Sequence, residues 1–226
     1  MDNFSKKKLT ETVLPSSSLT WKNDAAQKKL KITFADEQME LLKRNEYKLC
    51  FARKIENFAY NIVWKASSDF MVNTVFRWID EYYLFASDAF AKSVNVNDIS
   101  TSNLVNIHTG EQSTLNSSGI LSQPSSSDIT SGFTINNASL PIHAGISQVC
   151  FDKNQNLICS PVFLSETEIL PQMRRTFVPD GNLLVWLDAD LETGIIFQNM
   201  PSQSIEIDFS KVDEAVINYT GVWEKI

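Results

Sequence analysis

The chain has 226 residues, 43% of them hydrophobic and 21% charged, with seven glycines and seven prolines, which excludes collagen-like, coiled-coil and wholly disordered proteins. Its net charge of −7, with basic residues mixed among carboxylates, lacks the basic surface that phosphate binding requires, so we expect no nucleic-acid partner. No run approaches the roughly 18 consecutive apolar residues of a spanning helix, so we expect no transmembrane helix.

Residues 1–30 are polar, lysine-rich and weakly patterned, which predicts a flexible arm ahead of one β-rich globular domain over residues 31–226. The basic cluster Lys6-Lys7-Lys8 is not followed by the apolar run of a secretory signal. We therefore expect cytoplasmic synthesis without a signal peptide, and release from the cell would need a non-classical route.

The first regular elements are a helix and two strands. Residues 35–45 place acidic residues first and basic residues last, as the helix dipole prefers, and predict one short helix. Tyr47–Arg53 and Tyr60–Lys65 alternate large and small or polar side chains, which predicts two antiparallel strands joined by a short turn.

The aromatic segment 70–90 fits either a helical stripe or two short strands interrupted at Asp80-Glu81. We favour the strands, because aromatic and β-branched residues are enriched there. In residues 93–140 half of the positions are serine, threonine or asparagine, and short alternations such as Val105/Ile107 predict short strands joined by long polar loops.

The last third of the chain indicates a β meander. We expect a hairpin from Gln148–Phe151 and Leu157–Val162, a turn at Pro179–Asn182, and a central strand at Leu183–Leu187, which is apolar on both faces. Short strands follow near residues 195–197, 205–209 and 216–219. The fold class is therefore mainly β: a single-domain antiparallel β-sandwich, or a barrel-like relative, with one short N-terminal helix.

Cys150 and Cys159 flank the polar segment 152–156 of that hairpin. If the loop is centred between Asn154 and Gln155, the two cysteines lie opposite each other and a disulfide is sterically conceivable. Two reduced, half-buried thiols are the favoured interpretation, since three cysteines are an odd number and the expected compartment is reducing.

The sequence contains no catalytic signature. Its two histidines, His108 and His143, are outside any nucleophile motif, and glycine-rich phosphate loops and Cys-x-x-Cys pairs are absent. We expect no enzyme and no cofactor, although a small hydrolase can leave no local signature. Asp188, Asp190 and Glu192 stand on alternate residues and are weak candidates for a calcium site, for which turn chemistry is the simpler explanation.

Four residues close together supply the candidate binding site: Arg77, Trp78, Tyr82 and Tyr83. Flat aromatic surfaces with polar edges are common docking surfaces for sugars and proteins, whereas the simpler interpretation places Trp78 in the core.

We expect a non-enzymatic binding module for a glycan, a membrane surface or a protein partner. One alternative is a pore-forming toxin of the insecticidal or cytolytic type, in which residues 93–140 rearrange on a membrane, because pore strands alternate apolar and polar residues. Another alternative is a structural protein that assembles into homo-oligomers.

Overall fold

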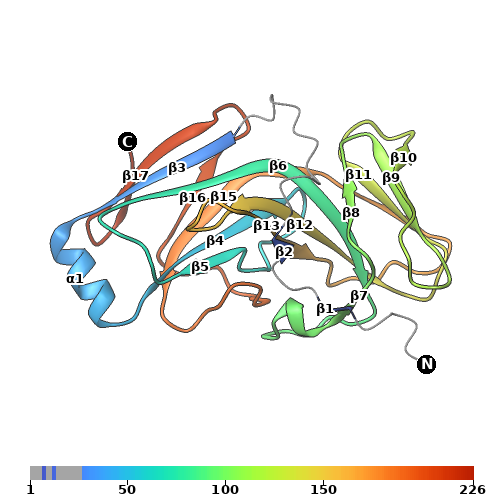
Figure 1. The fold of residues 1–226 in the computed structure, drawn as a ribbon, viewed down its shortest axis with the longest axis horizontal. Coiled ribbons are helices and arrows are strands. Elements are labelled where there is room, and N and C mark those ends of the chain that lie inside the picture. The colour runs from blue at the N-terminus through green and yellow to red at the C-terminus, as the bar shows by residue number, and fades with distance from the viewer. Residues whose placement is uncertain (1–6, 9–11, 14–26) are drawn as a thin grey trace.

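The computed structural model describes residues 7–8, 12–13 and 27–226, and the fold is mainly β, with 52% strand and 6% helix (Figure 1). Within these described residues the single α-helix is α1 (Asp36–Arg44), and a short 3₁₀ helix covers Val96–Asp98. The strands are β1 (Lys7–Lys8), β2 (Thr12–Val13), β3 (Gln27–Phe34), β4 (Lys48–Ile55), β5 (Lys65–Ser67), β6 (Asn73–Ser87), β7 (Ser100–Thr101), β8 (Val105–Ile107), β9 (Glu111–Leu115), β10 (Ser125–Ser126), β11 (Phe133–Asn137), β12 (His143–Phe151), β13 (Leu157–Leu164), β14 (Arg174–Phe177), β15 (Pro179–Asp188), β16 (Ser204–Asp208), β17 (Glu214–Tyr219) and β18 (Trp223–Lys225).

Three sheets are formed. The largest has ten strands in the order β18-β17-β3-β6-β12-β13-β2, with β1, β7 and β8 attached at its side. The second follows the order β16-β15-β4-β5, and the third follows β10-β9-β11-β14. Most pairings are antiparallel, as expected, while β17 runs parallel to β3 and β11 runs parallel to β9.

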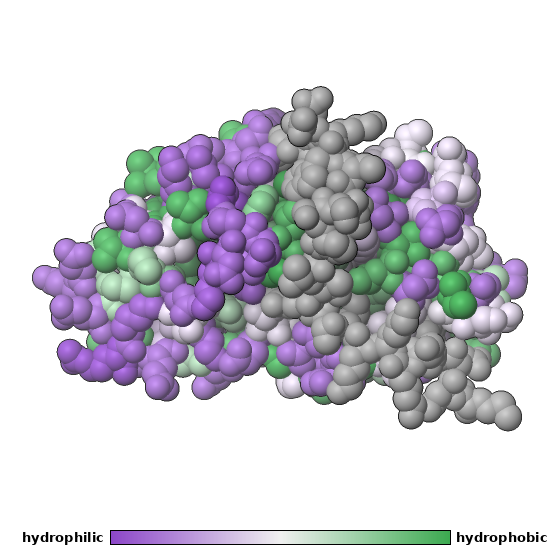
Figure 2. Space-filling model, viewed as in Figure 1, coloured by the Kyte–Doolittle hydropathy of each residue, from purple (hydrophilic) through white to green (hydrophobic). Residues whose placement is uncertain are grey.

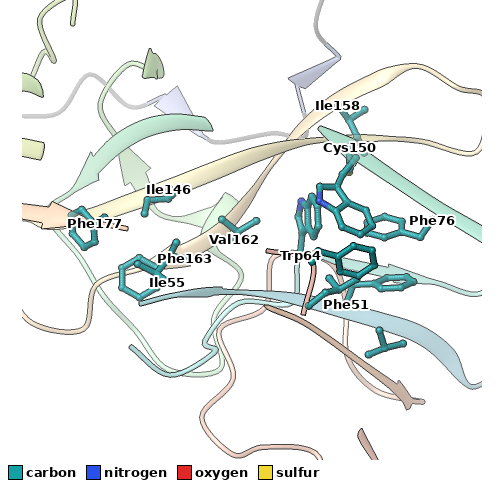
Figure 3. Close-up of a cluster of buried hydrophobic side chains, with 14 of the residues drawn as sticks. Phe51, Ile55, Trp64, Phe76, Ile146, Cys150, Ile158, Val162, Phe163 and Phe177 are labelled. Carbon is teal, nitrogen blue, oxygen red and sulfur yellow. The ribbon is translucent and has the colours of Figure 1, made fainter. Parts of the chain in front are cut away.

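The core lies between the ten-stranded sheet and the β4–β15 sheet (Figure 3). Phe51 of β4 stacks on Phe76 of β6 with the ring centroids 4.1 Å apart, and Trp64 meets Phe76 edge to face at 5.1 Å. A fully buried side chain of this size stabilises the fold by roughly 2–3 kcal/mol through removal of apolar surface from water. The sandwich is therefore held by aromatic contacts between its two layers.

The predicted helix is confirmed as α1. Its first turn carries Asp36 and Glu37 and its last turn carries Lys43 and Arg44, which matches the helix dipole. Leu42 is its buried anchor. Within the part of the chain that the structure describes, no helix has the length and apolarity needed to cross a bilayer.

The segment 70–90 forms strand, as favoured, but as the single 15-residue strand β6 and not as two. β3 pairs with its first half, and β12 pairs with its second half. Gln148 of β12 pairs with Tyr82 of β6, whereas Cys150, two residues on, pairs with Trp78, four residues back. The extra residues of β6, Asp80 among them, therefore form a bulge, and the strand continues through it.

The predicted hairpin is confirmed as β12 and β13, and its register determines whether Cys150 and Cys159 lie opposite each other. Cys150 lies opposite Ile158, and Cys159 lies opposite Val149. Because successive residues of a strand face opposite sides of the sheet, this one-residue offset places Cys150 in the main core and Cys159 on the other face. None of the three cysteines forms a disulfide.

The predicted turn at Pro179–Asn182 is wrong. The segment lies inside β15, where Pro179 opposes Ile55 and Leu183 opposes Arg53, so that extra residues form a bulge. Gly181 is needed for close approach, because a Cβ there would lie 2.5 Å from the backbone nitrogen of Ser210. The side chain of Asp180 accepts the Asn182 amide, which is turn chemistry used without reversing the chain.

The central strand is confirmed. Leu183 and Val185 of β15 face the main core, whereas Leu184 and Trp186 face a second cluster with Tyr60. These four side chains are fully buried. β4 and β16 flank β15 on either side.

Two boundaries differ from the sequence expectation. The strand that follows β4 and pairs with it is β5, at Lys65–Ser67 and not at the predicted residues 60–65. Residues 60–64 form no strand and contribute a single bridge from Ile62 to Ile196. The arm predicted over residues 1–30 ends earlier, since residues 27–30 belong to β3. Most of its remaining residues lie outside the described residues, apart from the short pairings of β1 and β2.

The polar segment 93–140 contributes the short strands β7 to β11, as expected, including Val105–Ile107 and Phe133–Asn137. Figure 1 shows β9, β10 and β11 together at one end of the molecule and α1 at the opposite end. Figure 2 shows the matching contrast in side chains, with strongly hydrophilic residues around the α1 end and the paler colours of serine and threonine at the other end.

Candidate functional site

The four residues predicted as a binding patch do not share a surface. Strand alternation directs Trp78 and Tyr82 to one face of β6, and Arg77 and Tyr83 to the other. Trp78 is fully buried in the core, so its assignment to a recognition patch is wrong and the core interpretation holds for it. Arg77 lies over the ring of Phe151 at 5.3 Å.

The two tyrosines of that patch are partly covered. Burial raises the pKa of Tyr82, which packs against Phe133. Burial also raises the pKa of Tyr83, and the nearby Glu81 carboxylate adds to the effect. Tyr82 and Asp80 line an open groove of about 610 Å³ together with His108, so this part of β6 reaches solvent there, with Tyr82 as its one residue from the predicted patch.

The carboxylates considered for calcium serve the local backbone. Asp188 Oδ1 accepts the amides of Asp190 and Leu191, and Glu192 pairs with Lys48. Among the residues that the structure describes, no group of three or more histidine, cysteine, aspartate or glutamate side chains is arranged to hold a metal ion. Turn chemistry accounts for this sequence pattern.

A second hollow of the described molecule contains none of the four patch residues, and we name it the aromatic cleft. It has a volume of about 780 Å³ and lies between α1, the end of β15, the loop before β16, and the β17–β18 hairpin. It is lined by Gln38, Leu41, Leu42, Asn45, Tyr47, Leu187, Asp188, Ala189, Pro201, Ser202, Gln203, Tyr219 and Trp223.

The β17–β18 hairpin supplies the aromatic wall. Tyr219 and Trp223 are direct cross-strand partners, and their ring centroids are 4.7 Å apart. Phe34 supports both rings from beneath at about 6 Å. The turn contains Gly221 with φ +100°, a conformation that favours glycine, and the amide of Gln38 lies 3.7 Å from the Cβ that another residue would carry.

Helix α1 and the segment after its end supply the opposite wall. Gln38 of the helix lines the cleft, as do Asn45, which caps the helix, and Tyr47, which is 37% exposed. Burial raises the pKa of Tyr219, and the proximity of the Tyr47 phenol adds to this effect. Both tyrosines line the cleft.

Several polar groups in the cleft are available to a ligand. The side chains of Gln38, Ser202 and Gln203 and the phenol of Tyr47 have no hydrogen-bond partner among the described residues. The indole nitrogen of Trp223 also lacks an acceptor in that part of the chain, but this atom is buried and is therefore not open to a ligand. Of the described lining residues, Asp188 is the sole charged one, and its Oδ1 is held by backbone amides.

A smaller hollow of about 210 Å³ adjoins the aromatic cleft. It is bounded by Gly221 and Val222, and it shares Gln203, Tyr219 and Trp223 with the larger one. The hairpin thus borders both hollows.

Sequence reasoning missed this site. Its residues come from segments near 38–47, 187–203 and 219–223, and no one of these segments has a motif. The spacing of Tyr219 and Trp223 around Gly221 was the available signal, because two aromatic residues flanking a glycine turn become neighbours in a hairpin. Comparison of the chain with protein-family models, with curated proteins and with solved structures gives no match.

Proposed function

We propose that this protein is a non-enzymatic binding module that holds an uncharged oligosaccharide in the aromatic cleft. The observation that carries the proposal is the contact between the Tyr219 and Trp223 rings in a cleft that is also lined by amide and hydroxyl groups with no hydrogen-bond partner among the described residues. Aromatic rings with polar edges dock flat, partly apolar ligands, and the remaining hydroxyls of a sugar need donors and acceptors around the ring.

Size and charge favour the same ligand class. A volume of about 780 Å³ lies within the usual range of small-ligand sites, roughly 300–1,000 Å³. None of the described lining residues is a lysine, arginine or histidine, so an acidic sugar would find no counter-charge there and would meet the Asp188 carboxylate. The proposal is therefore specific to neutral glycans.

The proposal includes no catalytic step. Glycoside hydrolysis generally uses two carboxyl groups on either side of the scissile bond, and the described lining of the cleft offers one, Asp188. Its Oδ1 already accepts two backbone amides, which supports a structural role for that carboxylate.

Affinity electrophoresis tests the proposal. The acidic native protein is run through gels containing soluble β-glucan, galactomannan or xyloglucan, with alginate as the acidic comparison. We expect retardation by at least one neutral polysaccharide and none by alginate. Trp223→Ala should weaken the retardation about tenfold, the range expected when one stacked ring is lost. Gln203→Ala should weaken it less.

The control is Met71→Ala, which removes a side chain that is 71% exposed outside the cleft and should leave retardation unchanged. Arg77→Ala tests the patch predicted from the sequence. Failure of every neutral polysaccharide to retard the protein would refute the proposal. Loss of retardation in Arg77→Ala but not in Trp223→Ala would move the site to β6.

A further inference from the structure

A second feature lies at the end of the molecule away from α1. Three loops, 116–121, 138–142 and 169–173, gather beside the ends of β9, β11 and β14, and we name them the apolar tip. Their exposed apolar side chains are Ile120, Leu140, Leu170 and Met173, which are 49–56% exposed. Solvent-exposed apolar side chains gathered in one place usually mark an interaction surface.

Asn137, which is 2% exposed, holds two of these loops together. Its Nδ2 donates to the carbonyl oxygens of Leu140 and Ile169 at 2.8 and 2.7 Å, and its Oδ1 accepts the amide of Ser139. Its backbone amide donates to the Met173 carbonyl at 2.9 Å. The buried carboxamide of Asn137 thus fixes the position of two loop carbonyls, and its backbone amide fixes a third.

The remaining loop is closed in the same way. Asn116 Oδ1 accepts the amides of Ser118 and Ile120, and the Asn116 amide donates to the Ile120 carbonyl. The Ala138 amide donates to the Leu115 carbonyl, which attaches this loop to the others. A loop can approach the hydrocarbon of a bilayer only where its backbone polar groups are already paired, and these loops meet much of that requirement.

The charge of the loops and of the whole chain indicates which kind of surface the apolar tip can bind. The three loops contain no aspartate, glutamate, lysine, arginine or histidine, the bordering Arg174 and Glu168 lie against Asp128 and His143, and the chain carries a net charge of −7. A neutral tip on an acidic protein gains nothing from anionic lipids, whose surface potential repels it. A zwitterionic bilayer matches the uncharged loops, whereas a basic or acidic protein surface would leave its charges unpaired against them.

We propose that the apolar tip docks on the surface of a zwitterionic lipid bilayer by shallow insertion of Leu140, Leu170, Met173 and Ile120. α1, which forms one wall of the aromatic cleft, lies at the opposite end of the molecule (Figure 1), so a docked protein keeps that site open. The inference is independent of the proposed glycan binding, because vesicles without sugar test it.

Flotation with phosphatidylcholine vesicles tests the proposal. We expect the full chain to float with these vesicles, and the double variant Leu140→Ser/Met173→Ser to bind at least tenfold more weakly. The matched control is Met71→Ser/Val75→Ser, which removes side chains that are 71% and 51% exposed away from the tip and should bind like the original chain. Adding phosphatidylserine should weaken binding at low salt.

A second measurement reports insertion directly. Leu140→Cys labelled with an environment-sensitive fluorophore should shift to the blue on phosphatidylcholine vesicles, whereas the same label on Met71→Cys should not. The three native cysteines are buried and should not take the label. The proposal would be overturned if the original chain did not float, or if both double variants lost binding equally. It would also be overturned if binding were confined to anionic vesicles, or if both labels shifted equally.

Discussion

Arg53 Nε donates a hydrogen bond to Oε1 of Gln148 at 3.0 Å, and this bond joins the two sheets of the sandwich through the core. Arg53 is on β4, is 3% exposed, and also donates to the carbonyl oxygens of Asp180, Gly181 and Asn182 in the bulge of β15. Gln148, on β12, in turn donates a hydrogen bond from Nε2 to Oδ1 of Asp80 at 3.0 Å. A buried guanidinium is tolerated because nearly all its donors are used.

Arg53→Leu should destabilise the protein by about 3 kcal/mol, because it leaves Gln148 Oε1 and the bulge carbonyls without a donor in the core. The measurement is the free energy of unfolding from urea titrations. Arg44→Leu, the same substitution at an exposed position, should change it by less than about 0.5 kcal/mol. Equal effects of the two substitutions would show that the network does not support the sandwich.

All three cysteines should titrate as free thiols only after unfolding. Burial raises the pKa values of Cys50 and Cys159 to about 12, so that almost no thiolate forms at pH 8. We expect negligible reaction of the native protein with a thiol reagent, and three equivalents in guanidinium chloride. One equivalent in the denatured, unreduced protein would mean that Cys150 and Cys159 are bonded, against the observed register.

Stability should fall in alkaline solution. The ordinary pKa values are 9.0 for the cysteine thiols and 10.0 for Tyr60, and burial raises all of them in the folded state, with the Glu206 carboxylate adding to the effect on Tyr60. The folded state therefore binds more protons than the unfolded state above pH 9. The stabilisation is complete below pH 9 and is lost progressively toward pH 12.

Urea midpoints measured at pH 7, 8.5 and 10.5 check this dependence. We expect little change between the first two values and a clear decrease at the third. In the double variant Cys50→Ala/Cys159→Ala the decrease should be shallower, because these two thiols no longer contribute to it. A midpoint independent of pH up to 10.5 would contradict the inferred burial of these groups.

The sequence by itself determined the elements whose signals are local. The dipole-matched charges of α1, the alternation of β4 and the hairpin of β12 and β13 depend on neighbours a few residues apart. The two-sided apolar run at Leu183–Leu187 also determined that β15 is a covered central strand. The β fold class follows from these patterns.

Register was decided by the tertiary structure. A shift of one residue in the β12–β13 pairing changes which face Cys159 occupies, and composition contains no information on that shift. The Pro179–Asn182 segment has the residues of a turn, but pairing with β4 and contact of Gly181 with Ser210 extend it into a bulge. Long-range pairing thus overrode local turn preference.

Both candidate surfaces likewise depend on the tertiary structure. The aromatic cleft brings α1 to a hairpin that is far along the chain, and the apolar tip joins three loops around Asn137. The predicted patch on β6 failed for a local reason, since alternation sends Trp78 and Tyr83 to opposite faces. Sequence periodicity determines which side chains share a face of one element, whereas contacts between distant elements determine which faces meet and which remain open.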